Sequence, residues 1–329
     1  MADVIRWGIL GTGNIAHKFA IGLKTASGAQ LVAVGSRTQA SADKFAAEFN
    51  VPRRHASYED LAQDAEVDAV YISTPHPFHV GNSKLCLQNG KAVLCEKPFT
   101  INVKEADEVI ALARQQHIFL MEAMWTRYLP ALIHTRELIA QGAIGEVRML
   151  TADFGFRTNF NEEGRLFDPK LGGGALLDVG IYPISLAFML FGAPQEIASQ
   201  AYLGETGVDE QSAYLFRYAA GQIALLSSAT RTETPQEAII LGTEGYIKLS
   251  SPWWNAAELI LKRAGKPEEV ISPARVGNGY NYEAEEVGRC LKAGKLESET
   301  MPLDETRAIM ATMDTIRAQW GLKYPMESN

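Results

Sequence analysis

Two glycines near the start of the chain stand where they could bind phosphate. Residues 11–16 read G-T-G-N-I-A, directly after an apolar run at residues 5–10 and before a helical pattern. In a strand–turn–helix unit Gly11 permits the tight turn, Gly13 lets the backbone approach a pyrophosphate, and Ala16 lets the helix pack on the strand. The N–H groups of the helix start would attract the phosphates. The pattern predicts a dinucleotide site, rather than an ordinary glycine turn, with contacts from Gly11, Thr12, Gly13, Asn14 and Ile15.

The end of the second predicted strand bears on which dinucleotide binds. An NAD-binding fold usually has an acidic residue there to bind the ribose 2′-hydroxyl. Residues 35–38 read G-S-R-T, with no acid. Arg37 can fork onto a 2′-phosphate while Ser36 and Thr38 donate hydrogen bonds. The segment therefore favours NADP over NAD, and the alternative is that Arg37 is a solvated loop residue.

A lysine follows a buried strand at residues 92–94. Residues 90–98 read G-K-A-V-L-C-E-K-P. Ligands of a doubly wound sheet bind outside the carboxyl ends of its strands, so we expect Lys97 to point into the nicotinamide crevice, which an ordinary surface lysine would not do. Pro98 makes a cis peptide bond possible, although most such bonds are trans.

An aspartate and a tyrosine stand four residues apart in a second segment. Residues 171–183 read L-G-G-G-A-L-L-D-V-G-I-Y-P, so on a helix Asp178 and Tyr182 share one face. The glycines would let this helix approach another backbone or a ligand closely. The alternative is an amphipathic helix whose tyrosine is the polar tip of the core. Asp178 weighs against it, because a carboxylate among Leu, Val and Ile needs a reason to be buried.

The elements that must position these residues form two texturally different parts. Residues 1–125 alternate short apolar runs with helical patterns, which predicts a doubly wound parallel sheet. Later segments alternate apolar and polar residues between glycine-containing turns, which predicts a mostly antiparallel sheet. We place the boundary near Trp125, giving domains 1–124 and 125–329. The predicted strands are 5–10, 31–35, 69–73, 92–94 and 118–121, then 146–156, 196–203, 212–218, 222–230, 237–241, 246–250 and 258–261. The predicted helices are 40–49, 78–88, 103–115, 131–140, 174–190, 282–291 and 304–320.

Composition disfavours two classes of partner. The 329 residues are 47% hydrophobic and carry a net charge of −8, so nucleic acid and anionic membranes would mostly repel the chain. Three scattered cysteines do not make a disulfide framework, which favours a reducing compartment. Without an export signal or long apolar run, we expect a cytoplasmic protein.

Five motifs in order resemble the Gfo/Idh/MocA oxidoreductases, and the resemblance spans essentially the whole chain. They are G-T-G-N-I-A, S-T-P-H-P-F-H at 73–79, C-E-K-P, L-M-E-A-M-W-T-R at 120–127 and G-G-G-A-L-L-D-V-G-I-Y. The likeness is strongest to the branch of dimeric dihydrodiol dehydrogenases and NADP-linked D-xylose dehydrogenases. It implies a Rossmann domain, an open-faced C-terminal sheet often used to form a homodimer, and a catalytic Lys97. It also implies that Tyr182 replaces the histidine of many relatives, with Asp178 beside it.

These roles give a chemical mechanism. Removing hydride from a carbinol carbon requires the hydroxyl to lose its proton, and a phenol with a pKa of about 10 is a poor base near neutrality. The ammonium of Lys97, within ~6 Å, would favour the phenolate. We therefore expect Tyr182 to be general base in oxidation and acid in reduction, Lys97 its electrostatic partner, and Asp178 its orienter.

Further contacts are expected around this centre. His76 and His79 form H-x-x-H, but no third ligand lies nearby in sequence, so we expect no metal. The resemblance places residues 74–79 near the nicotinamide. Expected cofactor contacts there and in C-E-K-P are Thr74, Pro75, His79, Glu96 and Lys97. Aromatic residues could form an apolar wall against a sugar or dihydrodiol ring. The expected substrate contacts are Trp125, Phe154 and Trp254, with Phe156 and Trp253 as weaker candidates, and Arg127, for which a structural ion pair is equally compatible.

Four functions can be weighed against these residues. The leading hypothesis is oxidation of a sugar or polyol, such as D-xylose to its lactone. Oxidation of a trans-dihydrodiol to a catechol uses the same hydride and proton acceptors. A regulator that senses NADPH without chemistry would have little need for both Lys97 and the Asp178–Tyr182 pair, and a structural subunit would not need the phosphate loop.

Overall fold

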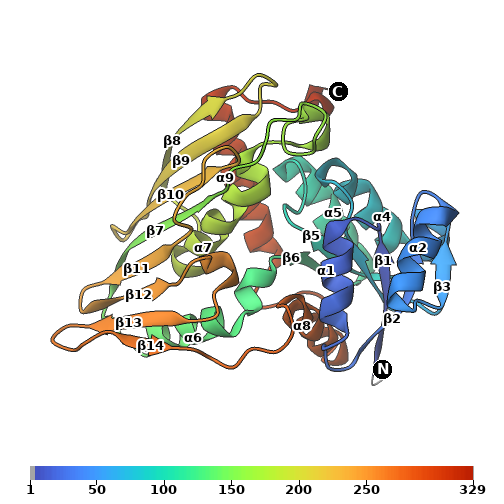
Figure 1. Ribbon diagram of the computed structural model, residues 1–329, viewed down its shortest axis with the longest axis horizontal. Helices are drawn as coiled ribbons and strands as arrows, with labels where there is room; N and C mark the ends of the chain where they lie inside the picture. The colour runs from blue at the N-terminus through green and yellow to red at the C-terminus, as the bar shows by residue number, and fades with distance from the viewer. Residues whose placement is uncertain (1–3, 329) are drawn as a thin grey trace. The chain divides into compact units, whose positions relative to one another are not determined.

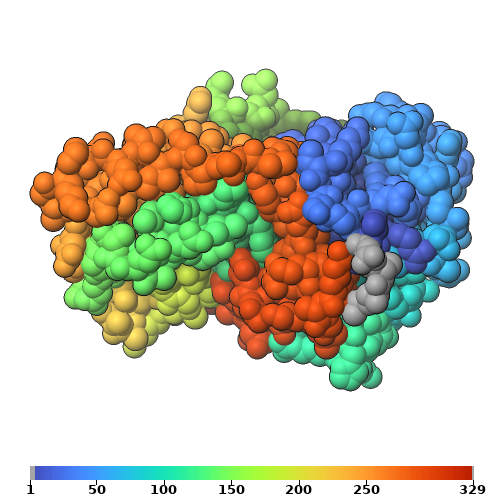
Figure 2. Space-filling model, turned by 90° about the horizontal axis from the view of Figure 1, so that it is seen from below, coloured from blue at the N-terminus to red at the C-terminus, as the bar shows by residue number. Residues whose placement is uncertain are grey.

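A computed structural model describes residues 4–328 and divides them into two units. Unit 1 contains the chain up to Trp125 together with Val276–Arg307, and unit 2 contains Thr126–Arg275 and the residues from Ala308 onward. This corrects the expected division at residue 125, which put residues 276–307 in the second domain. They join unit 1 because helix α8 (Tyr280–Lys292) packs on α1 (Asn14–Leu23) through its buried face. Figure 2 shows α8, in dark orange, beside α1, in blue.

Unit 1 is built on a parallel sheet of six strands in the order β3-β2-β1-β4-β5-β6. The strands are β1 (Ile5–Leu10), β2 (Ala29–Gly35), β3 (Arg53–His55), β4 (Ala69–Ile72), β5 (Ala92–Glu96) and β6 (Leu120–Ala123). All residues of β4, β5 and β6 are buried, because helices cover both faces of a parallel sheet (Figure 1). The predicted doubly wound fold is confirmed. The short strand β3 was not predicted, since its three residues are all polar.

The helices of unit 1 connect these strands. They are α1, α2 (Gln39–Phe49), α3 (Tyr58–Gln63), α4 (His79–Gln88), α5 (Val103–Gln116) and α8. Side chains cap three of them: Thr38 begins α2, Ser57 begins α3 and Asn102 begins α5. Helix α1 begins after Gly13 with no side-chain cap, so its first N–H groups are left for another partner.

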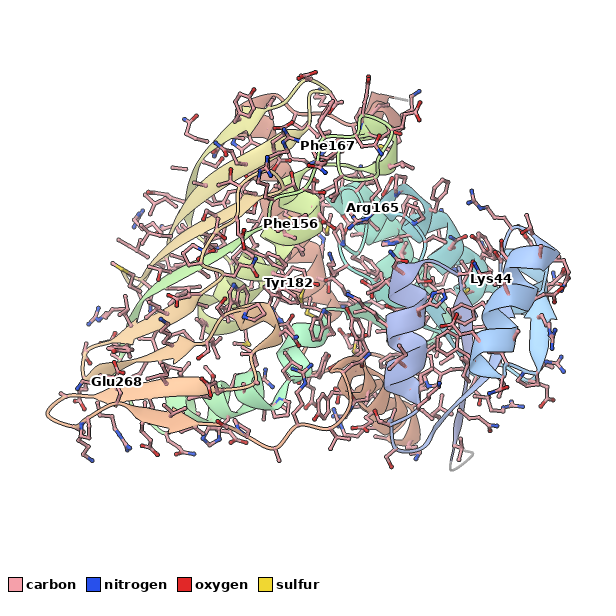
Figure 3. All side chains as sticks on the ribbon, in the orientation of Figure 1. Lys44, Phe156, Arg165, Phe167, Tyr182 and Glu268 are labelled. Atoms are coloured by element: carbon pink, nitrogen blue, oxygen red, sulfur yellow. The ribbon has the colours of Figure 1, made fainter. Side chains whose placement is uncertain are left out.

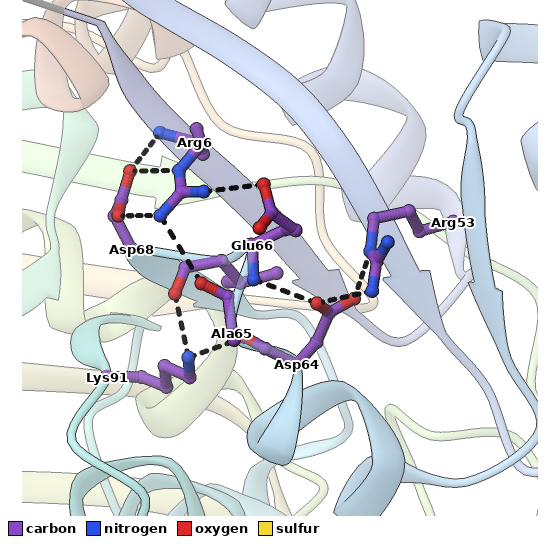
Figure 4. A network of polar contacts seen from close by, with 8 residues as sticks. Arg6, Arg53, Asp64, Ala65, Glu66, Asp68 and Lys91 are labelled. Carbon is purple, nitrogen blue, oxygen red and sulfur yellow. Dashed lines mark hydrogen bonds and ion pairs between the residues drawn. The ribbon is translucent and has the colours of Figure 1, made fainter. Parts of the chain in front are cut away.

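A polar network connects the strand ends on the side of the sheet opposite the turn at residues 11–15 (Figure 4). The guanidinium of Arg6 donates to both carboxylate oxygens of Asp68, at 3.0 and 2.8 Å. The ammonium of Lys91 donates to the carbonyl oxygens of Asp64 and Val67, at 2.6 and 2.8 Å. Of the two lysines that flank β5, Lys91 is therefore structural, and Lys97 lies at the other end, where ligands of such sheets bind.

Unit 2 is built on a sheet of eight strands in the order β14-β13-β12-β11-β7-β10-β9-β8. All neighbours are antiparallel except β7 and β10, which pair in parallel. The strands are β7 (Val147–Gly155), β8 (Glu196–Leu203), β9 (Asp209–Arg217), β10 (Ile223–Ala229), β11 (Ala238–Gly242), β12 (Gly245–Leu249), β13 (Leu259–Arg263) and β14 (Glu269–Ile271). The predicted, mostly antiparallel sheet is confirmed.

Helices cover one face of this sheet, and the other face is open (Figure 1). They are α6 (Pro130–Ala140), α7 (Ile181–Phe191) and the part of α9 (Leu303–Trp320) that follows Arg307. The predicted single helix 174–190 is instead a π-helical turn, Leu176–Gly180, that runs into α7. Among residues 4–328, one helical stretch, Pro169–Phe191, is long and apolar enough to cross a membrane, but 83% of its most apolar window is buried inside the protein. Such burial is typical of a core helix.

Candidate active site

The turn between β1 and α1 has the shape that a pyrophosphate requires. Gly11 has a φ of +106°, and a Cβ there would lie 2.8 Å from the Ser73 Oγ. Gly13 has no atom within 4 Å of the position its Cβ would occupy, so space remains for a ligand against the backbone. The uncapped N-terminus of α1 directs its N–H groups into the same space. Residues 11–15 therefore fit a dinucleotide phosphate group.

The loop after β2 supports part of the predicted 2′-phosphate site. Arg37 is exposed, and Ser36 is buried with its Oγ 3.3 Å from the Oγ1 of Thr12. Thr38 was expected to donate a hydrogen bond to the phosphate, and this is wrong for its hydroxyl. That group donates to the Ser41 Oγ at 2.9 Å and accepts from the Ser41 backbone N–H at 3.3 Å, because it caps α2. Arg37 and Ser36 are left as candidates.

His79 connects two loops instead of facing a ligand. Its side chain is fully buried, with Nδ1 2.9 Å from the Pro98 carbonyl oxygen and Nε2 2.7 Å from that of Thr74. Burial lowers the pKa of this imidazole. The expectation of a direct cofactor contact from the His79 ring is therefore corrected: His79 fixes the loops after β4 and β5. Within residues 4–328 no group of three metal-ligating side chains gathers around His76 and His79 or elsewhere.

The loop after β4 presents two other expected contacts. Thr74 is buried, and its Oγ1 accepts a hydrogen bond from the Asn82 amide at 3.0 Å. Pro75 is exposed at the start of a short 3-10 helix. Their position after a strand of the parallel sheet agrees with a cofactor site, which stays a prediction for both residues.

The C-E-K-P segment ends β5 with a buried carboxyl and a half-buried lysine. Glu96 accepts a hydrogen bond from the Tyr71 hydroxyl and, at 3.2 Å, from the backbone N–H of Lys97. Burial raises the pKa of Glu96 to about 7. The Glu96 side chain, expected as a cofactor contact, is thus already engaged inside unit 1 and holds the backbone of Lys97.

Sequence reasoning missed a second buried carboxyl near Glu96. Glu283 of α8 is fully buried, and neither of its carboxyl oxygens has a hydrogen-bond partner among residues 4–328. Burial raises the pKa of Glu283, and the neighbouring Glu96 raises it further. An available signal was that Glu283 falls between Tyr280 and Ala284 on the buried face of an amphipathic helix.

In unit 2 the predicted tyrosine lies in an aromatic cluster. The ring centroid of Tyr182 is 5.3 Å from that of Phe154 and 6.4 Å from that of Trp254. Phe154 and Trp254 stack on each other at 4.7 Å with their planes 2° apart. Phe156 lies edge-on to Phe154 at 6.4 Å. Strand β7, helix α7 and the segment after β12 thus bring together the side chains that we predicted separately, and Figure 3 labels Tyr182 and Phe156.

Asp178 has a partner that the sequence did not reveal. It is 6% exposed, and its Oδ1 accepts a hydrogen bond from the Arg165 guanidinium at 2.8 Å. The Arg165 side chain is half-exposed, in the loop after β7. The ion pair fixes Asp178 on the π-helical turn one helical turn before Tyr182.

Three residues that were expected to contact the substrate have partners within the protein. Arg127 is buried and donates to the Ser185 Oγ at 3.0 Å and to the Ser185 carbonyl oxygen at 2.7 Å. This hydrogen bonding to α7 favours the structural alternative for Arg127. Trp125 belongs to unit 1, where it stacks on Tyr280 at 4.8 Å. Trp253 is a core residue that donates its Nε1–H to the Asp153 carbonyl oxygen at 2.7 Å.

Comparison with known proteins supports the assignment of both units. Residues 5–124 match the model of an oxidoreductase family with an NAD-binding Rossmann fold, and residues 132–248 match the Gfo/Idh/MocA C-terminal domain. The chain belongs to the Gfo/Idh/MocA oxidoreductase family. This oxidoreductase is 39% identical to a trans-1,2-dihydrobenzene-1,2-diol dehydrogenase of Danio rerio, over 98% of the chain and 99% of the relative. It is 37% identical to the Homo sapiens protein of the same name, with the same coverage.

Solved structures show the same fold. A levoglucosan dehydrogenase in complex with NADH and levoglucosan superposes with a TM-score of 0.87 at 18% identity, over 98% of this chain and 99% of that one. A 3-ketoreductase from Actinomadura kijaniata, in complex with NADP and TDP-benzene, superposes with a TM-score of 0.86 at 23% identity, over 96% and 97%. Together with the dehydrogenase relatives, the family match makes this chain an NAD(P)-dependent dehydrogenase.

Proposed function

We propose that this oxidoreductase oxidises a ring hydroxyl of a small cyclic substrate, either a trans-dihydrodiol or a pyranose sugar, with NADP as hydride acceptor. The observation that carries the proposal is the placement of the Tyr182 phenol beside the stacked rings of Phe154 and Trp254. A flat aromatic wall suits the C–H face of a sugar and the diene face of a dihydrodiol. The names of the relatives favour the dihydrodiol, and the levoglucosan dehydrogenase neighbour favours the sugar.

The reaction divides between two kinds of transfer. A bound nicotinamide would supply the hydride acceptor, and the protein must take the hydroxyl proton. Tyr182 accepts that proton, and a carbonyl forms on the substrate. From a dihydrodiol, the resulting ketone tautomerises to a catechol, so each turnover yields one catechol, one NADPH and one proton.

The proposal assigns supporting roles to Lys97 and Asp178. An ammonium near a phenol makes it a better base, and we assign that role to Lys97. Asp178, held by Arg165, orients the helix face that carries Tyr182. Thr74, Pro75 and the 11–15 turn contact the nucleotide.

We propose NADP as the preferred cofactor because Arg37 follows β2 where an NAD-binding fold usually has an acid. We assign its exposed guanidinium to the 2′-phosphate, together with the hydroxyl of Ser36.

We also propose that a second copy of the chain covers the open face of the sheet in unit 2. Leu215, Leu225 and Tyr202 are 47%, 45% and 59% exposed there. The face lines a shallow groove of about 810 Å³ between β8, β9 and β10. Apolar residues on a flat face suit isologous pairing. Light scattering that gives a monomer mass would contradict this part.

The test of the proposed function is a turnover assay with matched variants. Purified protein is mixed with NADP and either trans-1,2-dihydrobenzene-1,2-diol or D-xylose, and the absorbance of reduced nicotinamide is followed. Tyr182→Phe and Lys97→Met should each lower kcat on the order of 100-fold or more. The matched controls Tyr246→Phe and Lys84→Met, both on exposed side-chain pairs, should keep kcat within about twofold.

Two outcomes would contradict the proposal. Near-wild-type turnover by Tyr182→Phe or Lys97→Met would contradict the role assigned to that residue. Tight NADPH binding without turnover across a broad panel of diols and sugars would instead identify a regulator.

A further inference from the structure

The buried carboxyl of Asp209, which has no assigned catalytic role, accepts a hydrogen bond from the turn that carries Asp178. Asp209, the first residue of β9, is fully buried. Its Oδ2 accepts a hydrogen bond from the backbone N–H of Leu176 at 2.8 Å, and from the Ser212 hydroxyl at 3.2 Å. Leu176 begins the π-helical turn, so the carboxyl binds this turn at its start.

The backbone lies close to β9 and β10 at Gly174, two residues before the turn, and at Gly180, its last residue. A Cβ on Gly174 would lie 2.3 Å from the Oδ1 of Asp209, and Gly174 also has a φ of +116°. A Cβ on Gly180 would lie 2.7 Å from the Tyr214 hydroxyl and 3.0 Å from the Ser228 Oγ. The sheet therefore contacts the turn at its beginning and at its end.

A chain of hydroxyls links these two contacts. The Oγ of Ser212 is 2.6 Å from the Tyr214 hydroxyl, which is 2.6 Å from the Oγ of Ser228. Asp209, Ser212, Tyr214 and Ser228 thus form one buried polar network beneath the turn. At the entry to the turn, the Tyr324 hydroxyl donates to the Gly173 carbonyl oxygen at 2.6 Å.

Packing alone does not explain why a carboxyl is kept here. Burial raises the pKa of Asp209 to about 7, which reflects the cost of placing the charged group there. The helix that follows is already buried among apolar side chains, including Ile181, Ile184 and Phe188. Apolar packing on all sides does not select one rotation of a helix, whereas a directed hydrogen bond does.

We propose that Asp209 is a positioning residue for hydride transfer. It fixes the start and rotation of the 176–180 turn, so that Asp178 meets Arg165 and the Tyr182 phenol faces Phe154 and Trp254. The proposal rests on the proposed function, in which Tyr182 takes the substrate proton.

The first experiment compares Asp209→Ala with Asp209→Asn. Asp209→Ala removes the acceptor of the Leu176 N–H and should lower kcat about 100-fold, the scale of a misplacement near 1 Å. Asp209→Asn keeps an oxygen acceptor and should recover at least ~10-fold of that loss. Each rate is divided by the concentration of protein that binds NADPH, so unfolded protein does not affect the value of kcat. A wild-type kcat in Asp209→Ala would overturn the inference.

A double-mutant cycle asks whether Asp209 acts through Tyr182. Residues that act as one unit are not additive, so Asp209→Ala should cost no further kcat in the Tyr182→Phe background. Losses that multiply would show a separate structural effect and overturn the inference. If Tyr182→Phe alone keeps wild-type kcat, the proposed function fails; if it is inactive while Asp209→Ala is fully active, only the inference fails.

A second variant tests the other end of the turn and does not depend on Asp209→Ala folding. Gly180→Ala should lower kcat ~10-fold by meeting the Tyr214 hydroxyl, and Tyr214→Phe in the same chain should restore part of it. Wild-type kcat in Gly180→Ala would contradict the close approach. The control is Glu269→Gln, which alters an exposed carboxyl of unit 2 that pairs with Arg263, and should leave kcat within about twofold.

Discussion

The two units hold their functional groups by different physical means. Unit 1 forms its phosphate turn with backbone: a glycine at positive φ, an open Cβ position and an uncapped helix start. Unit 2 holds its tyrosine with side chains: Arg165 on Asp178, Arg127 on Ser185, and Asp209 on the Leu176 N–H. We infer that an added side chain disrupts the phosphate turn of unit 1, and that loss of a polar side chain disrupts the positioning of Tyr182 in unit 2.

The largest effect should come from adding a side chain at Gly11. Gly11→Val places a β-branched residue at a φ of +106° and a Cβ 2.8 Å from the Ser73 Oγ. Strain of about 2–3 kcal/mol would weaken NADPH binding on the order of 100-fold. Nucleotide titration measures it. The control is Gly81→Ala, in α4, where no atom lies within 4 Å of the added Cβ and affinity should not change. Equal affinity in Gly11→Val would break the comparison.

Removing the Arg37 guanidinium should change selectivity within unit 1. A charge-assisted hydrogen bond contributes about 1.5–3 kcal/mol, so Arg37→Ala should lower the NADP to NAD ratio of kcat/KM about 10- to 100-fold. The control is Arg54→Ala, a half-exposed arginine of β3. An unchanged ratio would leave Arg37 as a solvated loop residue.

Removing one side chain of unit 2 should separate catalysis from cofactor binding. Arg165→Ala leaves the buried carboxylate of Asp178 without its ion-pair partner, and we expect kcat to fall about 10-fold. NADPH affinity should stay as in the wild type, because every proposed nucleotide contact lies in unit 1. A loss of affinity with unchanged kcat would reverse the proposed division of labour. Arg148→Ala, on an exposed pair with Glu146, is the control.

The smallest effect is a pH dependence of stability in which the units contribute separately. Burial raises the pKa of Glu96 in unit 1 and of Asp209 in unit 2 to about 7, above the unfolded value of about 4. The folded protein binds these protons more tightly, so the stabilisation is full below pH 4 and is lost as the pH rises through 7. Urea unfolding at pH 5 and pH 8 measures it. Glu96→Gln and Asp209→Asn should each flatten the decline, on the order of 1 kcal/mol. A stability that rises over this range would contradict both shifts.

Much of the fold could be predicted from the sequence, because the spacing of apolar residues and glycines determines where strands, helices and turns form. The glycine turn and the periodic apolar runs predicted the parallel sheet, and alternation predicted the sheet of unit 2. The missed β3 has three polar residues, and the π-helical turn at 176–180 depends on contacts with β9 that spacing along one helix does not encode. Residues 276–307 belong to unit 1 because α8 packs on α1, which is far from it in the sequence.

The sequence predicted several residues of the site, but it did not predict which side chains would contact each other. Phe154, Tyr182 and Trp254 were each named from residue type and resemblance, and the structure brings them together. Arg165 and Asp209 were missed because each acts through a partner that spacing along the chain does not reveal. Glu283 was missed although it falls on the buried face of an amphipathic helix. Thr38 and His79 were assigned to the cofactor, whereas their polar atoms complete backbone hydrogen bonds nearby, which competes with ligand binding.

The most direct measurement is the pH profile of kcat for oxidation, compared between wild type and Lys97→Met. The account assigns the limiting base to the Tyr182 phenol, with an ammonium at residue 97 that favours its phenolate. It predicts an apparent pKa of kcat below 10 in the wild type and one that moves up towards about 10 in Lys97→Met. The same apparent pKa in both proteins would contradict it.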